Sequence, residues 1–287
     1  MSVKFGSAGA PESFYAQGFK SSLDMPAWLA DMGLTAYEYQ CSRGVKIKEK
    51  MARELGERAR RHGVALSIHA PYYINLSTEE PEKKVKTKGY ILDSLRVARW
   101  MGATTVVFHP GGGPGTDRRG TFDRAKTLFK EILRDAAEEG LDDILLAPET
   151  MGKLNQIGSL DEILELCTMA EQVVPCVDFG HLNAVTQGNL KSKEDFARVL
   201  DKIAVTLGKE ALTGLHIHFS PIEFTKAGEK KHWTLKESYL YGPDFTPLAE
   251  LIWERSLEPV IICESAGTQA EDALVFKQIY EKLNPNK

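Results

Sequence analysis

The sequence has few cysteines, no long apolar run and no excess of basic residues. Its cysteines, Cys41, Cys167, Cys176 and Cys263, lack Cys-x-x-Cys spacing, which excludes a zinc ribbon and favours reduced thiols over a disulfide framework. No apolar run approaches the roughly 20 residues that span a bilayer, and the N-terminus lacks a basic-then-apolar signal pattern. We therefore expect a soluble, cytoplasmic protein with no membrane partner.

The length and the net charge of the chain exclude fewer classes of protein. The formal net charge of -4 gives no global positive field to attract nucleic acid, so such a partner would need a local basic surface. The 287 residues are 43% hydrophobic, enough for one large α/β barrel or two smaller domains. No linker, low-complexity tract or composition break divides the chain. We expect a single domain over residues 1–287, and we infer no obligate protein partner.

Short apolar runs, each too short for a helix and several rich in β-branched residues, alternate with segments of helical spacing. The runs are Val3–Phe5, Ala36–Tyr39, Ala65–Ile68, Thr105–Phe108, Ile144–Ala147, Val173–Val177, Gly214–Ile217 and Val260–Cys263. The helical segments are Met25–Met32, Lys48–His62, Gly89–Met101, Thr121–Glu139, Asp161–Glu171, Lys193–Leu207, Pro247–Arg255 and Glu271–Leu283.

This alternation predicts the α/β class and a single (β/α)8 barrel, the TIM barrel, with extended loops at the C-terminal face of the strands. Two of these loops are long, Ala70–Lys88 and Ser220–Pro243. A doubly wound open sheet is the competing fold. The count of strands and the lack of a Gly-x-Gly-x-x-Gly motif after the first one favour the barrel.

The last six predicted strands each end at side chains that can bind a metal ion. These side chains are His69, His109, Glu149, Asp178 with His181, His216 with His218, and Glu264. Because the C-terminal ends of barrel strands surround one cavity, we expect these side chains to converge. Imidazoles and carboxylates without thiolate suit Zn²⁺, with Mn²⁺, Fe²⁺ or Co²⁺ as alternatives. The set exceeds the needs of one ion, so it predicts two or three.

Two pairs within this set leave alternatives open. Residues two apart on a strand point to the same side, so His216 and His218 could both face the cavity, and only one is needed as a ligand. Asp178 and His181 are three apart over a turn and could serve different ions. For any single histidine, the plain alternative is a buried side chain satisfied by its neighbours.

The motifs SIHAPYYINL, FHPG, PET, VDFGHL and HIHFS, with Glu264, resemble those of the endonuclease IV family of apurinic/apyrimidinic (AP) endonucleases, over residues 65–265. The resemblance implies a first zinc on His69, His109 and Glu149, and a second zinc on Glu149, Asp178, His216 and Glu264. Glu149 would bridge the two ions and is the catalytic residue that the resemblance implies.

A third zinc in that family is held by a histidine after the sixth strand and by an Asp-x-His pair in the loop after the seventh. Here His181 and His232 match the histidines, but the position two before His232 is Lys230, which cannot ligate as a cation. Glu229 could replace the aspartate through a one-residue shift. We therefore expect two or three zinc ions per chain.

The same resemblance implies DNA repair: metal-activated hydroxide hydrolyses the phosphodiester 5′ to an abasic site in double-stranded DNA, leaving a 3′-hydroxyl and a 5′-deoxyribose phosphate. It places a DNA-penetrating tyrosine at Tyr72, although packing against the rim is the plain alternative. Arg43, Lys230 and Lys231 are candidate DNA contacts by their place in loops, since loop cations can neutralise phosphates. Solvated surface charge is the alternative for each of them.

The chief rival is a metal-dependent sugar isomerase or epimerase of the xylose-isomerase-like barrels. These proteins use a strand-end Glu, Asp, His and Glu, which Glu149, Asp178, His216 and Glu264 would equally supply. His69, His109, His181 and His232 would then be surplus, whereas a nuclease explains them. A barrel that retained the fold as a binding protein is a third hypothesis, and the intact set of ligands argues against it.

Overall fold

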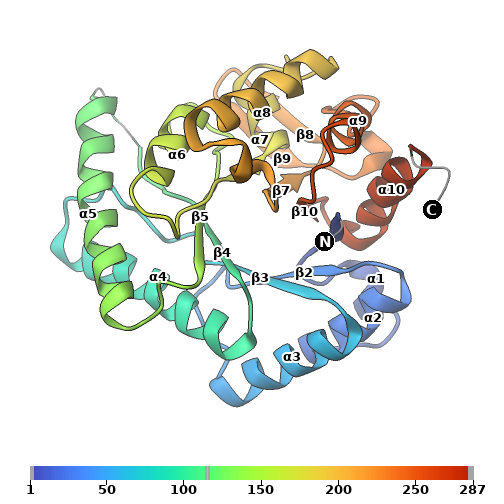
Figure 1. The fold of residues 1–287 in the computed structure, drawn as a ribbon, viewed down its shortest axis with the longest axis horizontal. Helices are drawn as coiled ribbons and strands as arrows, with labels where there is room; N and C mark the ends of the chain where they lie inside the picture. Colours follow the sequence, from blue (N-terminus) through green and yellow to red (C-terminus); the bar gives the residue numbers. More distant parts are fainter. Residues whose placement is uncertain (1–2, 114, 116, 284–287) are drawn as a thin grey trace.

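The chain forms a ring of parallel strands surrounded by helices (Figure 1). The computed structural model describes residues 3–113, 115 and 117–283. Eight parallel strands pair in the order β5-β4-β3-β2-β1-β10-β7-β6. Isolated parallel bridges from Leu146 to Val173 and from Glu149 to Cys176 join the two edges of this sheet. The predicted (β/α)8 barrel is confirmed.

The strands are β1 (Lys4–Ala8), β2 (Ala36–Gln40), β3 (Ala65–His69), β4 (Thr105–Phe108), β5 (Leu145–Pro148), β6 (Cys176–Asp178), β7 (His216–Phe219), β8 (Ile222–Thr225), β9 (Gly228–His232) and β10 (Val260–Cys263). The α-helices are α1 (Glu12–Ala16), α2 (Met25–Asp31), α3 (Glu49–His62), α4 (Pro81–Met101), α5 (Arg118–Glu138), α6 (Leu160–Cys167), α7 (Phe179–Val185), α8 (Lys193–Leu207), α9 (Thr246–Glu254) and α10 (Gln269–Lys282). Short 3-10 helices cover Ser22–Asp24, Lys209–Leu212 and Leu235–Glu237.

Alternation along the strands separates an apolar outside from a polar inside. In β3, Leu66 and Ile68 belong to the main hydrophobic core, whereas Ser67 hydrogen-bonds to Glu38 of β2. Outside the ring, the buried Phe129 of α5 packs against Phe108 of β4. The helices thus supply the apolar packing, and the interior can hold polar groups near the C-terminal ends of the strands.

Three sequence-based boundaries were wrong in ways that matter for the site. The seventh strand begins at His216 and not at Gly214, because Gly214 has a left-handed φ of +77° and Leu215 closes a turn onto the preceding 3-10 helix. The helix predicted from Gly89 already begins at Pro81, and proline is well suited to a helix N-terminus. The predicted loop 220–243 contains the antiparallel hairpin β8–β9.

All four cysteines are free and buried. Across residues 3–113, 115 and 117–283, no helix is long and apolar enough to cross a membrane.

Candidate metal centre

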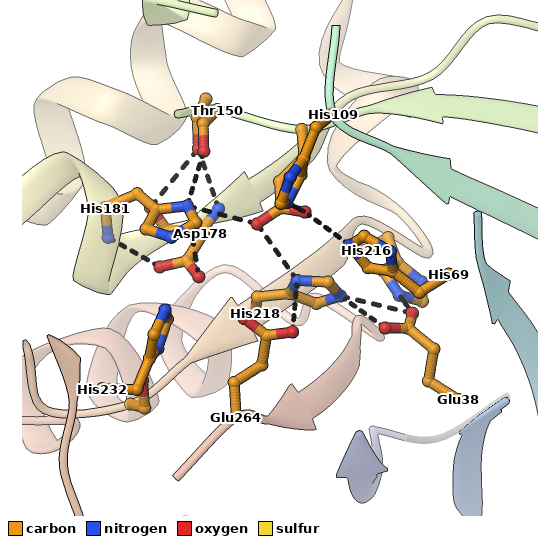
Figure 2. Close-up of polar contacts among 12 residues, drawn as sticks. Glu38, His69, His109, Thr150, Asp178, His181, His216, His218, His232 and Glu264 are labelled. Atoms are coloured by element: carbon orange, nitrogen blue, oxygen red, sulfur yellow. Dashed lines mark hydrogen bonds and ion pairs between the residues drawn. The ribbon is translucent and has the colours of Figure 1, made fainter. Parts of the chain in front are cut away.

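The C-terminal ends of six barrel strands bring histidines and acids together (Figure 2). Among the described residues, four groups have possible ligand atoms within 4.8 Å of one another, and three of them contain the acids at the strand ends. These three are His69, His109 and Glu149; Glu149, Asp178, His218 and Glu264; and Asp178, His181 and His232. We call them the first, second and third groups. Glu149 belongs to the first two and Asp178 to the last two, so the groups adjoin.

Glu149 directs its two carboxylate oxygens to different neighbours. Oε2 lies 3.2 Å from Nε2 of His69 and 3.2 Å from Nε2 of His109. Oε1 lies 3.2 Å from Nδ1 of His181 and 3.3 Å from Nδ1 of His218. Burial raises the pKa of Glu149, but the nearby His218 and His109 outweigh this effect and hold that pKa well below its usual value. Glu149 is therefore a buried carboxylate shared between groups.

The histidine of the second group is His218, not the expected His216. The Nδ1 atom of His218 lies 3.5 Å from Oε1 of Glu264, whereas Nε2 of His216 lies 2.9 Å from Oε2 of Glu38. In the sheet, His218 pairs with Asp178 and His216 pairs with Cys176. Both imidazoles face the barrel interior, but β7 ends two residues later than predicted, so His218 is the one level with the acids.

Sequence reasoning missed Glu38, which is fully buried in β2 beneath the second group. Burial raises the pKa of Glu38, but His218 and His216 outweigh this effect and hold that pKa well below its usual value. The sign of its role is spatial, because the folded ring brings Glu38 of β2 against His216 and His218 of β7. A single glutamate in the run AYEYQ gives no such signal from sequence alone.

A bulge in the hairpin β8–β9 decides which acid faces the third group. Glu223 pairs with Lys231 and Phe224 pairs with Glu229, so Lys230 is an extra residue in β9. A bulge shifts the alternation of side chains by one position. Glu229 consequently lies beside the third group, with Oε2 3.5 Å from Nε2 of His181 and Oε1 3.7 Å from Nε2 of His232. Lys230 instead pairs with Glu223 at 2.6 Å.

Backbone and hydroxyl groups fix the rings of three histidines. Nδ1 of His69 donates to the carbonyl oxygen of Ala70, and Nδ1 of His181 donates to that of Thr150, both at 2.9 Å. Nδ1 of His232 is hydrogen-bonded to the Ser220 hydroxyl at 2.7 Å. Because a carbonyl oxygen only accepts, Nδ1 carries the proton in His69 and His181. In the neutral rings the lone pair then lies on Nε2, the atom that would bind an ion, an arrangement common in metal sites.

The second group contains buried polar atoms that lack a hydrogen-bond partner among the described residues. They are Oε1 of Glu149, Oδ2 of Asp178 and Nδ1 of His218. Burial raises the pKa of Glu264 to about 8, against the opposing effect of His218, and the charges of Glu149 and Asp178 add to the rise. Buried unpaired acceptors and crowded carboxylates are costly without a cation. The second group therefore fits a divalent ion.

A cavity of about 500 Å³ opens above these groups and is lined by Tyr72, Lys231 and the histidines His69, His109, His181 and His232. Tyr72 is 57% exposed. Nζ of Lys231 lies 3.9 Å from the ring centre of Trp233. Arg43 lines a neighbouring hollow of about 320 Å³ that shares Gln40 and Ser42 with the cavity. Among the predicted DNA contacts, Lys230 pairs with Glu223 and does not line the cavity, and the other three lie in or beside it.

The fold and these groups together define a TIM barrel with a candidate multi-metal centre at the C-terminal ends of its strands. The chain belongs to the family of xylose isomerase-like TIM barrels, whose model matches residues 26–280.

Relatives and solved structures add detail to this family. The uncharacterized protein MJ0133 of Methanocaldococcus jannaschii is 34% identical over 97% of both chains. A probable endonuclease 4 of Thermoplasma acidophilum is 25% identical over 67% of this chain and 68% of its own. The resemblance to the endonuclease IV family is thereby confirmed.

Two solved structures share the fold with equal TM-scores of 0.70. Endonuclease IV of Thermus thermophilus is 21% identical, over 97% of this chain and 99% of its own. A D-tagatose 3-epimerase-like protein is 20% identical, over 98% of this chain and 96% of its own. The family model and the endonuclease 4 relative support an enzyme.

Proposed function

We propose that the protein is a zinc-dependent DNA-repair endonuclease that hydrolyses the phosphodiester 5′ to an abasic site. The observation that carries this proposal is the set of three adjoining groups at one cavity. A sugar isomerase needs only the four residues of the second group. The first and third groups add four histidines, which an enzyme acting on a phosphodiester uses to hold further ions. The relative named probable endonuclease 4 supports the same choice.

In this proposal each group holds one divalent ion, with Zn²⁺ preferred by the donor set and Mn²⁺, Fe²⁺ or Co²⁺ as alternatives. Glu149 bridges the first two positions, because its oxygens face different groups. His181, His232 and Glu229 hold the third, with Asp178 between the second and third. His218 replaces His216 as the histidine of the second position.

When bound, such ions activate water and neutralise charge on the attacked phosphate. The residues of this chain do the positioning. Hydrogen bonds to backbone carbonyls hold His69 and His181 with Nε2 toward the cavity. Glu149 would keep two ion positions close together, which suits a two-ion hydrolysis of a phosphodiester. Lys231 at the cavity and Arg43 beside it supply positive charge for the DNA backbone.

The test is an incision assay on a duplex with one abasic site, run beside a matched intact duplex and a panel of ketoses. We expect cleavage 5′ to the lesion, with 3′-hydroxyl and 5′-deoxyribose phosphate ends, and no cleavage of the intact duplex. Conversion of a ketose without incision would overturn the proposal and establish the sugar isomerase instead. Inactivity of the fully metal-loaded protein on every substrate would indicate a binding protein.

The assignment of His218 instead of His216 to the second ion position gives a direct prediction about metal content. His218→Ala is expected to lower the number of tightly bound ions by one, because Nδ1 of His218 is an unpartnered atom of the second group. His216→Ala, the matched control, is expected to keep the wild-type number, because His216 contacts Glu38 and no acid of that group. Elemental analysis of both purified variants checks this. The opposite pattern would return His216 to the second position.

Tyr72 is expected to contribute to DNA binding and not to metal binding. Tyr72→Ala should raise the Kd for abasic duplex by about tenfold or more, since aromatic stacking is worth about 1–3 kcal/mol per base. Its bound ions should stay at the wild-type number. Fluorescence anisotropy and elemental analysis measure the two effects. Tyr15→Ala is the control, because Tyr15 is 58% exposed and does not line the cavity. Equal loss of DNA and metal would mark Tyr72 as a packing residue.

A further inference from the structure

Glu38 lies beneath the second group and collects hydrogen bonds from four side chains. Its Oε2 accepts from the Ser67 hydroxyl at 3.0 Å and from Nε2 of His216 at 2.9 Å. Its Oε1 lies 3.1 Å from Nε2 of His218 and accepts from Nε2 of Gln40 at 3.1 Å. Figure 2 shows the Glu38 carboxylate at the Nε2 end of the His218 ring, whereas Glu264 lies at its Nδ1 end. All four of these side chains thus present donors to Glu38.

These contacts determine which nitrogen of His218 carries the proton. An ionised carboxylate only accepts hydrogen bonds, so Nε2 of His218 must be protonated to bond with Glu38. In the neutral imidazole that an ion would bind, Nδ1 then holds the lone pair. That atom is buried without a hydrogen-bond partner, 3.3 Å from Oε1 of Glu149 and 3.5 Å from Oε1 of Glu264. The hydrogen bond below therefore prepares the ligand atom above.

The same layer also offers a different grouping, because ligand atoms of Cys176, His216 and His218 lie within 4.8 Å of one another. An ion there would compete with contacts that already exist. Nε2 of His216 and Nε2 of His218 both bond to Glu38. Nδ1 of His218 lies against the acids of the second group. Glu38 thus already engages the Nε2 atoms of both histidines, which favours support of the site above over a separate ion.

We propose that Glu38 is a positioning residue: its carboxylate fixes the tautomer and the ring orientation of His218, so that Nδ1 faces the ion position of the second group. Carboxylates that bond to the far nitrogen of a ligating histidine commonly have this effect, and their loss typically weakens metal binding about 10–100-fold. The inference rests on the proposed assignment of His218 to that ion position. It does not depend on which substrate the enzyme takes.

The variant Glu38→Gln tests this inference with almost no change in volume. The glutamine side chain keeps one acceptor oxygen and gains an NH₂ donor. This donor faces an imidazole nitrogen, and at His218 it favours the tautomer with the proton on Nδ1. We expect Co²⁺ to bind the second position about 10–100-fold more weakly, with a changed visible absorption spectrum. Ser67→Ala is the matched control: it removes another hydrogen bond to Glu38 without touching His218. It should retain wild-type Co²⁺ affinity and spectrum.

Co²⁺ titration of ion-free protein, followed by visible absorption, needs no substrate. Wild-type affinity and spectrum in a folded Glu38→Gln would overturn the inference. If that variant does not fold, nitrogen NMR of zinc-loaded wild type decides: we expect the Nε2–H tautomer of His218, and an Nδ1–H tautomer contradicts it. Absence of Co²⁺ binding by wild type would overturn both the ion assignment and the inference. Normal Co²⁺ results without abasic-site incision would overturn only the proposed nuclease function.

Discussion

Glu149→Gln is expected to abolish incision at abasic sites while the protein stays folded. Glu149 is fully buried, and its oxygens contact two pairs of histidines. The amide lacks the negative charge that offsets two ions. Its NH₂ group also faces imidazole nitrogens, and it cannot accept hydrogen bonds from them as a carboxylate oxygen does. The paired ions supply several kcal/mol of charge stabilisation, so a loss of about 4 kcal/mol corresponds to a fall of about 10³-fold in kcat.

The matched control is Glu162→Gln. Glu162 is also poorly exposed, but it lies at the start of α6 and bonds to Arg118 and to the backbone of Gly158. The Glu162→Gln variant should lose some stability and keep the wild-type kcat. Single-turnover incision, elemental analysis and thermal unfolding separate the effects. Full activity in Glu149→Gln would eliminate Glu149 as the bridging residue.

Removal of metal is expected to abolish activity and to lower the unfolding temperature, and Zn²⁺ should restore both. Ions that bind only the folded state stabilise it, by about 2.7 kcal/mol at a free concentration of 100 Kd. Burial raises the pKa of Glu264 to about 8, so without an ion this carboxyl group keeps its proton at pH 7. An incoming ion must displace that proton. Apparent metal affinity should therefore fall as pH falls from 8 to 6.

The sign of the stability effect follows from the same pKa. A carboxyl group whose pKa is raised on folding destabilises the ion-free protein progressively as pH rises from its ordinary value of 4.5 to about 8. The rise in unfolding temperature on adding Zn²⁺ should consequently be larger at pH 8 than at pH 6. Calorimetry at both pH values, with elemental analysis near three ions per chain, checks this. Unchanged unfolding temperatures with and without chelator would contradict the proposed centre.

The barrel and most of the side chains around the cavity could be predicted from sequence, because short apolar runs mark strand ends directly. His69, His109 and Glu149 follow such runs and converge as expected. The choice between His216 and His218 could not be predicted, since it depends on where β7 begins after the turn at Gly214. A shift of two residues keeps a side chain on the same face of a strand but changes its depth in the barrel.

Other features depend on contacts between distant segments. The extra residue Lys230 in β9 becomes visible only when β9 is paired with β8. Glu38 gains its role from imidazoles about 180 positions later in the chain. Neither strand carries a local motif for these arrangements, so a single sequence reveals the ligand types around the cavity more readily than the residues that orient them.

The closure between β5 and β6 gives the centre a mechanical consequence. These edge strands are joined by isolated bridges at Leu146 and Glu149, whereas β4 and β5 share a continuous four-residue ladder. Glu149 follows β5 and Asp178 ends β6, so an ion shared by them would clamp a junction that is joined by isolated bridges and not by a continuous ladder. Loss of that ion would free this seam first, and the wall beside the cavity would begin to open before the rest of the barrel unfolds.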